Sequence, residues 1–192
     1  MIYDLSIFKK TVKRSFDLIV SIVSLITFFW LIFIAWLIAS IDTKSNGFFF
    51  QQRVGKGGEI FNVVKIKTMK PLVGITTTVT RSDDLRITRI GAFFRKTKID
   101  ELPQLFNVLV GQMSIVGPRP DVPGFADKLE GIERSILNLR PGITGPASIK
   151  YRNEEEMLSQ VEDPERFNRE VIWPDKVALK LSLLMSSSDL VI

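Results

Sequence analysis

The stretch LIVSIVSLITFFWLIFIAWLIASI, residues 18–41, contains 24 consecutive positions without a charged residue. As an α-helix it would be about 36 Å long, which exceeds the roughly 30 Å thickness of a bilayer's hydrocarbon core. A signal peptide is the competing interpretation, but this run is long and has no small-residue cleavage site. We therefore expect a membrane anchor over residues 1–42 and a second domain over 43–192.

Two membrane topologies are open to this anchor. A single crossing that keeps the four basic residues of segment 9–14 inside would carry the rest of the chain to the outer face. A re-entrant helix, which dips into one leaflet and returns, would leave both parts in the cytoplasm. Such a turn needs a helix disruption, and the run has no Pro or Gly, only four Ser and Thr residues.

The remaining chain predicts a small α+β domain that is mostly helical. Residues 48–67 indicate a short β-hairpin around a Gly-rich turn. The glycines fit neither common phosphate-loop pattern, which favours a plain turn. Lys65 and Lys67 would share one strand face, either solvent-facing or an anion site.

Helices are expected in the rest of this domain. Residues 86–98 and 125–139 have amphipathic spacing, and the first of these helices would carry a basic face, either solvated or on a bilayer surface. A helical arm is expected after residue 154. An apolar stripe over residues 177–185 would pack on the core or lie on lipid.

Charge and composition limit the chemistry. The chain has a formal net charge of +5, and residues 43–98 contain 12 Lys or Arg against 3 Asp or Glu. This cationic block suits anionic lipids, a polyanion or a phosphorylated small molecule. There is no Cys and no His, which excludes thiolate, zinc-thiolate and Ser-His-Asp chemistry. A metal bound by carboxylates alone would be a hard cation such as magnesium or manganese.

An adjacent pair of carboxylates, Asp100 and Glu101, is the candidate reactive centre. Asp100 occupies an expected helix N-cap, with Pro103 in the first turn and several cations just before it. This setting should favour the ionised form of Asp100, which could then act as a nucleophile or metal ligand. Ordinary helix capping is the alternative. Arg119 lies between two prolines, which predicts a stiff loop. Its side chain would either bind a phosphate or face solvent.

Six motifs together resemble the monotopic phosphoglycosyl transferases, the bacterial sugar transferases that begin glycan assembly. They occur in the family's order over residues 13–176. They are KRSFD at 13–17, FFQQRVG at 49–55, DLRITRIG at 84–91, RKTKIDELPQL at 95–105, GPRP at 117–120 and RPGITG at 140–145.

The resemblance implies transfer of a sugar 1-phosphate from a UDP-sugar to polyprenyl phosphate, with release of UMP. Asp100 would be the nucleophile that forms a phosphosugar-aspartyl intermediate, near a Mg²⁺ ion, and Glu101 would act as base toward polyprenyl phosphate. Arg95 would hold a phosphate near the membrane. The nucleotide end would involve Arg119 and Pro120. These roles make UDP-sugar, polyprenyl phosphate and membrane lipids the expected partners.

Lys65 stands where the family has a lysine in its strand motif. The family usually has Ser-Pro in the middle of its membrane helix, whereas this chain has Phe29 and Trp30. Lys67 stands where members often have Arg, so bidentate geometry is lost. The family also implies the bacterial inner membrane, with the catalytic domain on its cytoplasmic face.

Two other functions are compatible with parts of the sequence. A non-catalytic adaptor could use the basic surface to hold anionic lipids or a glycan-assembly partner. Nucleic-acid binding ranks last because no recognisable module is present, so no nucleic-acid partner is expected. The sequence identifies neither the sugar nor the polyprenyl length, and it leaves the oligomeric state open, a homo-oligomer included.

Overall fold

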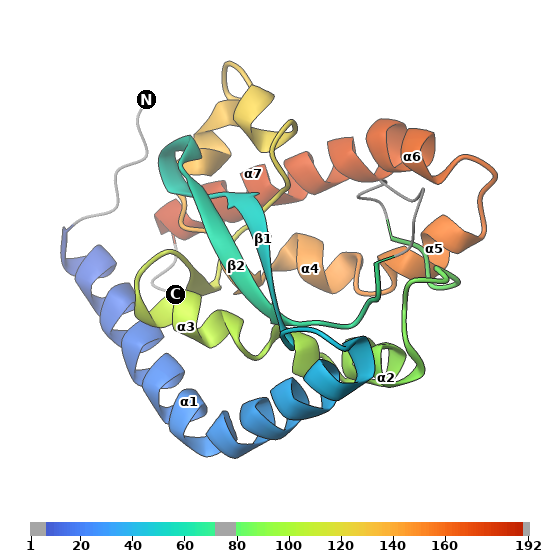
Figure 1. Cartoon of the computed structure of the whole chain (residues 1–192). Helices are drawn as coiled ribbons and strands as arrows, with labels where there is room; N and C mark the ends of the chain where they lie inside the picture. Colours follow the sequence, from blue (N-terminus) through green and yellow to red (C-terminus); the bar gives the residue numbers. More distant parts are fainter. Residues whose placement is uncertain (1–6, 72–79, 190–192) are drawn as a thin grey trace.

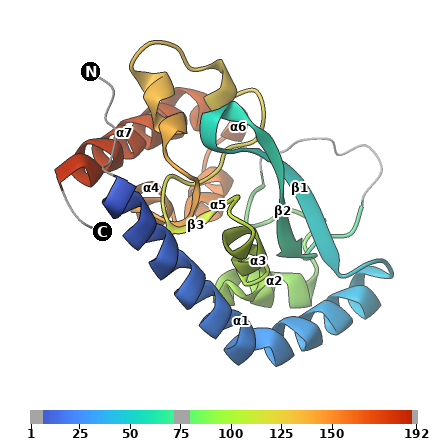
Figure 2. The ribbon, with the colours of Figure 1, turned by 90° about the vertical axis from the view of Figure 1, so that its left-hand side faces the viewer.

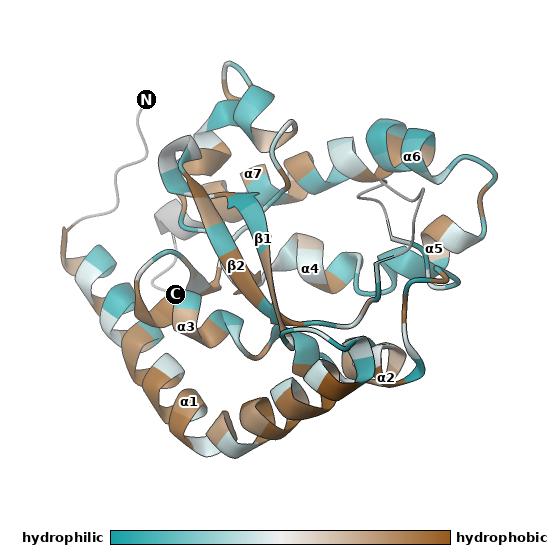
Figure 3. Ribbon diagram, viewed as in Figure 1, coloured by the Kyte–Doolittle hydropathy of each residue, from teal (hydrophilic) through white to brown (hydrophobic). Residues whose placement is uncertain are grey.

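The computed structural model describes residues 7–71 and 80–189, which form a mixed helix and strand fold with one long apolar N-terminal helix (Figure 1). The predicted α+β class is confirmed at this level. The long helix, α1, spans Ile7–Thr43 and is long and apolar enough to cross a membrane by length and composition. Only 22% of its most apolar window is buried, so most of the hydrophobic residues coloured brown along α1 in Figure 3 are not covered by the protein.

Helix α1 is bent into two arms whose vertex points away from the rest of the chain (Figures 1 and 2). Five consecutive residues, 26–30, are all exposed, so contact with the protein is interrupted there for more than a full turn. The helix has no Pro or Gly. Leu25 before this gap and Ile32 after it pack in one cluster with Leu105, and farther along the second arm Ala35 and Ala39 pack with Phe94. Both arms are therefore packed on the rest of the protein, on either side of a stretch that is exposed.

A buried polar network fixes the first arm to the domain. Asp17 is 0% exposed, and its Oδ1 accepts hydrogen bonds from Lys13 Nζ, Ser114 Oγ and Ile115 N, each at 3.0 Å. A buried carboxylate is tolerated only when such donors surround it. The neighbouring Arg14 guanidinium donates to the carbonyls of residues 108 and 109, at 2.7 and 2.9 Å. It thereby satisfies acceptors at the C-terminal end of α3.

The predicted hairpin is confirmed. Strands β1 (Phe48–Val54) and β2 (Ile60–Ile66) pair antiparallel, with Phe49 opposite Lys65 and Arg53 opposite Phe61. The Gly-rich segment between them is a turn, in which Gly57 and Gly58 have positive φ. Side chains of directly opposed residues share a face, so Phe49, Arg53 and Lys65 project to the same side of the hairpin.

The next elements lead to the carboxylate pair. Helix α2 (Arg89–Thr97) confirms the central part of the predicted basic helix, and Thr88 Oγ1 caps its N-terminus by accepting from Gly91 N at 2.8 Å. Gly91 lies so close to the backbone of Thr68 that an added Cβ would fall 2.1 Å from a carbonyl oxygen. After the 3-10 turn Ile99–Glu101, helix α3 spans Gln104–Leu109.

A second, two-stranded sheet joins distant segments. Strands β3 (Ser114–Val116) and β4 (Gly142–Thr144) run parallel. A Cβ on Gly142 would meet the backbone of Gly117 at 2.1 Å, so this pair of motifs needs glycine for its close backbone approach.

The helix predicted over residues 125–139 is wrong. Two short 3-10 helices, Ala126–Lys128 and Glu133–Asn138, lie there instead. Gly131 separates them with φ of 55°, a conformation that interrupts an α-helix. Arg134 holds the resulting loop together by donating to the carbonyls of Asp127 and Leu129.

The C-terminal part is a series of helices, as expected. These are α4 (Pro146–Lys150), α5 (Glu154–Ser159), α6 (Pro164–Phe167), a π-helix (Asn168–Ile172) and α7 (Trp173–Asp189). In α7, Val177 and Leu184 are each only 4% exposed. Val177 and Leu184 of the apolar stripe therefore pack on the core, whereas Met185 is 59% exposed.

Candidate active site

The carboxylate pair lies in a tight turn between α2 and α3. Lys98 ends α2 in the left-handed conformation, with φ of 59°, and Ile99–Glu101 continue as a 3-10 turn. Pro103, not Asp100, is the N-cap residue of α3. The prediction that Asp100 caps this helix is therefore wrong, because the chain winds through one extra turn before α3 begins.

Asp100 is buried and lacks a partner. Asp100 is only 6% exposed, and its Oδ1 has no hydrogen-bond partner among the described residues. Burial raises the pKa of Asp100 to about 6, and the negative charge of Glu101 adds to this effect. Lys65, Arg95 and Lys98 oppose the shift but do not cancel it. The expectation of a favoured ionised form is therefore wrong in direction, since desolvation outweighs the nearby cations.

Glu101 has the opposite electrostatics. Its Oε1 lies 3.3 Å from Arg119 Nη2 and 3.6 Å from Lys65 Nζ. Burial alone would raise the pKa of Glu101, but Arg119 and Lys65 outweigh it and hold the pKa well below its usual range. Burial also lowers the pKa of Lys65 to about 8, against the attraction of Glu101. Two adjacent carboxylates thus differ in their readiness to accept a proton.

A cleft of about 600 Å³ brings the predicted residues together. Its wall includes every candidate site residue inferred from the sequence, namely Lys65, Arg95, Asp100, Glu101, Arg119 and Pro120. Arg95 lies there as an ion-pair partner of Glu155 and donates to Thr68 Oγ1 at 3.2 Å. Lys67 also lines the cleft, so the shared face of the hairpin is a cavity wall rather than open solvent.

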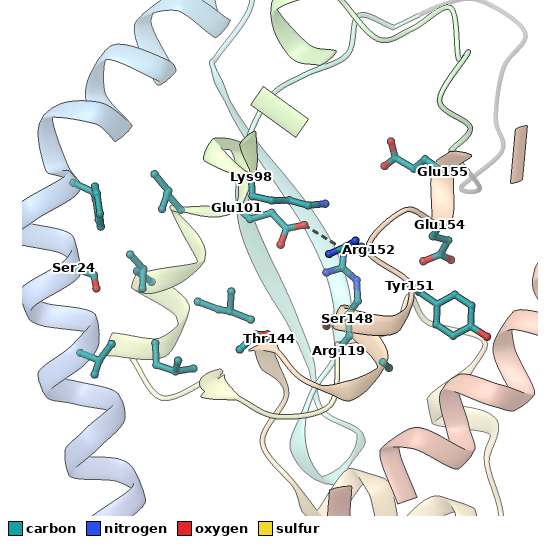
Figure 4. A pocket seen from close by; sticks show the side chains of 17 residues that line it. Ser24, Lys98, Glu101, Arg119, Thr144, Ser148, Tyr151, Arg152, Glu154 and Glu155 are labelled. Atoms are coloured by element: carbon teal, nitrogen blue, oxygen red, sulfur yellow. Dashed lines mark hydrogen bonds and ion pairs between the residues drawn. The ribbon is translucent and has the colours of Figure 1, made fainter. Parts of the chain in front are cut away.

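A second cavity of about 500 Å³ lies between α1 and α4 (Figure 4). Most of its lining is apolar and comes from α1, α3 and the segment around β4. Its polar end shares Lys98, Glu101 and Arg119 with the first cleft. Figure 4 shows Ser24 of α1 across the cavity from the ion pair of Glu101 and Arg119. Glu101 therefore lies where a cation-rich cleft meets an apolar cavity that reaches the membrane-type helix, and Asp100 lines the cleft beside it.

The model of the family described as bacterial sugar transferase matches residues 8–188. The chain belongs to the bacterial sugar transferase family. The resemblance drawn from the six motifs is thus confirmed. The family assignment identifies the chain as a membrane-associated enzyme, in agreement with the length and composition of α1.

Named relatives of this sugar transferase act on undecaprenyl phosphate. A Bacillus subtilis (strain 168) protein, provisionally named undecaprenyl-phosphate N-acetylgalactosaminyl 1-phosphate transferase, is 41% identical over 62% of this chain and 67% of its own length. The undecaprenyl-phosphate glucose phosphotransferase of Komagataeibacter xylinus is 40% identical over 71% of this chain. The UDP-glucose:undecaprenyl-phosphate glucose-1-phosphate transferase of Klebsiella pneumoniae is 34% identical over 78%. The chain spans only 27% and 33% of the last two proteins.

Sequence reasoning missed several cleft residues of this sugar transferase. Arg53 lines the cleft, donates to the carbonyl of Pro120 at 3.2 Å and to Gln51 Oε1 at 2.6 Å. Strand alternation could have found it, because Phe49, Gln51 and Arg53 recur at every second position. Arg152 lines the apolar cavity beside Arg119. It lies in the short turn between α4 and α5, so no periodicity points to it.

Proposed function

We propose that this enzyme transfers a sugar 1-phosphate from a UDP-sugar to a polyprenyl phosphate and releases UMP. The observation that carries the proposal is that Glu101 lines two unlike cavities, while the adjacent Asp100 lines the cation-rich one. A reaction between a water-soluble diphosphate and a lipid phosphate needs both kinds of cavity at one reactive group. The names of the relatives support the same pair of substrates.

The cation-rich cleft suits the nucleotide-sugar. Lys65, Arg53 and Arg119 surround the place where the diphosphate would lie, and their charges would stabilise negative charge as it develops in the transition state. The apolar cavity suits the first isoprene units of the polyprenyl chain. Arg152 at its polar end supplies a cation for the lipid phosphate.

The chemistry would proceed in two displacements at phosphorus. Asp100 attacks the phosphorus that carries the sugar, the bond to the UMP oxygen breaks, and UMP leaves with the electron pair. A phosphosugar-aspartyl group remains. An oxygen of polyprenyl phosphate then attacks the same phosphorus and releases the carboxylate. The pKa of about 6 leaves Asp100 mostly ionised at neutral pH, and its burial makes it a poorly solvated nucleophile.

Glu101 is assigned as the base in the second displacement. In the free enzyme Arg119 and Lys65 keep the pKa of Glu101 low, which makes it a poor proton acceptor. When these cations turn to substrate phosphates, they leave the carboxylate and its pKa rises. Glu101 would then accept the proton of the incoming polyprenyl phosphate.

Magnesium fits this centre as a substrate-borne ion. Among the described residues no three carboxylates gather into a metal cage. Mg²⁺ is commonly held by one or two carboxylates together with substrate phosphates. The unpartnered Oδ1 of buried Asp100 offers one such oxygen. A bound Mg²⁺ would neutralise part of the diphosphate charge.

We further propose that α1 is re-entrant and that the enzyme works on the cytoplasmic face of the bacterial inner membrane. The bend in α1 and the exposed apolar turn at residues 26–30 support a helix that dips into one leaflet. On α2, Ile90 and Phe93 are 40% and 57% exposed and suit contact with lipid. Because the chain has no Cys, single cysteines can be placed in turn at Lys10 and Gln160. Both should react with an impermeant reagent only from the cytoplasmic side, whereas labelling from opposite sides would contradict the re-entrant form.

The test of the proposed function is UMP release from a panel of UDP-sugars with polyprenyl phosphate and Mg²⁺. Release that requires the lipid phosphate and produces polyprenyl-diphosphate sugar supports it and identifies the sugar. The adaptor alternative expects salt-sensitive lipid binding that survives loss of both Asp100 and Glu101, and no UMP from any sugar of the panel.

The pH dependence of kcat/KM should be bell-shaped. Asp100 must lose its proton to attack, so activity rises with pH through about 6. Lys65 must keep its proton to stabilise the phosphate, so activity falls above about 8. These limbs appear in kcat/KM because it reports ionisation of the free enzyme. Lys65→Arg keeps the charge throughout this range and should remove the upper limb. An unchanged profile in that variant would rule out Lys65 as its cause.

A further inference from the structure

The cleft has an aromatic end beyond Pro120 that the proposed chemistry does not use. Phe125, Asn168 and Trp173 line it. The rings of Phe125 and Trp173 meet edge to face, with centroids 5.1 Å apart and an interplanar angle of 70°. Both aromatic residues are only half-buried, so part of each ring remains available to the cavity. An aromatic wall of this kind provides a stacking surface for a flat ring.

This end is connected to the reactive carboxylates through a short series of contacts. Arg119, which contacts Glu101 at 3.3 Å, begins the tripeptide that ends at Asp121. Asp121 is ion-paired with buried Lys180, whose Nζ lies 5.0 Å from the ring centroid of Trp173.

The opposite end of the cleft lies against the membrane helix. There Lys67 donates to Ser45 Oγ at 2.7 Å, and Lys70 lies 3.7 Å from Asp42 of α1. Figures 1 and 2 place α7, which begins with Trp173, far from the vertex of α1. The leaving nucleotide is polar and must return to water, so it is expected at the α7 end.

Asn168 has the hydrogen-bonding groups that a pyrimidine requires. It is half-buried and is the first residue of the π-helix Asn168–Ile172, a distortion frequent at functional sites. Within the described ranges its side-chain amide has no hydrogen-bond partner. An amide offers one acceptor and donors side by side. These groups match the N3–H and an adjacent carbonyl of uracil.

We propose that Asn168, Phe125 and Trp173 form the nucleobase pocket of this enzyme, in which Asn168 reads the pyrimidine edge and the aromatic rings stack on the base. This inference rests on the proposed function, because it assigns the nucleotide of the same donor substrate. It makes Asn168 a specificity-determining residue that does not touch the reacting phosphorus.

The decisive variant is Asn168→Asp. A carboxylate only accepts hydrogen bonds, so it repels a uracil carbonyl but accepts from the amino group of cytosine. The ratio of kcat/KM for a UDP-sugar to that for the CDP-sugar with the same sugar should fall by about 100-fold. A variant that is merely less stable would lose activity with both donors and leave this ratio unchanged.

Asn168→Ala and a matched control complete the test. The Ala variant should raise KM for the UDP-sugar about 10- to 100-fold, leave KM for polyprenyl phosphate unchanged and weaken UMP binding by a similar factor in calorimetry. Asn138→Ala removes an exposed amide outside the described cavities and should behave as the wild type. UMP binding needs no turnover, so it keeps the two proposals separable.

Wild-type enzyme that releases no UMP from any UDP-sugar contradicts the proposed function. Active enzyme whose base preference and UMP affinity survive both Asn168 substitutions contradicts the nucleobase pocket.

Discussion

An Asp100→Asn variant is expected to release UMP about 1000-fold more slowly than the wild type, or slower still, in both the presence and the absence of polyprenyl phosphate. The amide has the size of the carboxylate but lacks its nucleophilic charge, so the first displacement cannot begin. The measurement is UMP release under single-turnover conditions, with enzyme in excess over UDP-sugar.

The structure makes this substitution a clean one. Oδ1 of Asp100 has no hydrogen-bond partner among the described residues, and folding therefore does not depend on that oxygen. Asp83→Asn is a matched control, because Asp83 is an exposed partner of Arg81 outside both cavities. The Asp100→Asn variant should keep the thermal midpoint and the UMP affinity of the wild type. UMP release at the wild-type rate would show that Asp100 is not the nucleophile.

Local patterns predicted those parts of the fold that depend on local chemistry. The uncharged run gave a long helix, and strand alternation with a Gly-rich turn gave the hairpin. The helix over 125–139 failed because Gly131 adopts a positive φ. A periodic pattern contains no information about the backbone conformation of this glycine. That conformation belongs to a turn that Arg134 stabilises by donating to backbone carbonyls.

The candidate site was predictable in its members but not in its electrostatics. Motifs identified the residues that meet in one cleft. The protonation of Asp100 depends on burial, and burial arises when α1, α2 and β2 pack around the turn. Counting nearby cations in the sequence therefore gave the wrong direction for its pKa. The bend of α1 likewise occurs in a helix without Pro or Gly, so a search for these residues could not detect it.

A Glu101→Gln variant is expected to separate the two displacements. It keeps the Asp100 nucleophile, so a burst of about one UMP per enzyme should still be released from the UDP-sugar. Transfer to polyprenyl phosphate should then slow by about 100-fold or more, because the amide cannot accept the proton of the lipid phosphate. The measurement is the burst of UMP compared with the steady-state rate, together with mass spectrometry of the intact protein for the added phosphosugar.

The same substitution tests the electrostatic role of Glu101. Without its negative charge, Arg119 and Lys65 lose their common partner, and the charge that helps to raise the pKa of Asp100 disappears. The lower limb of the burst rate should therefore move to lower pH. Glu162→Gln, at an exposed position outside both cavities, should leave burst, turnover and pH limb unchanged. If Glu101→Gln loses the burst as completely as Asp100→Asn, Glu101 acts in the first displacement, and the division of labour between the two carboxylates is wrong.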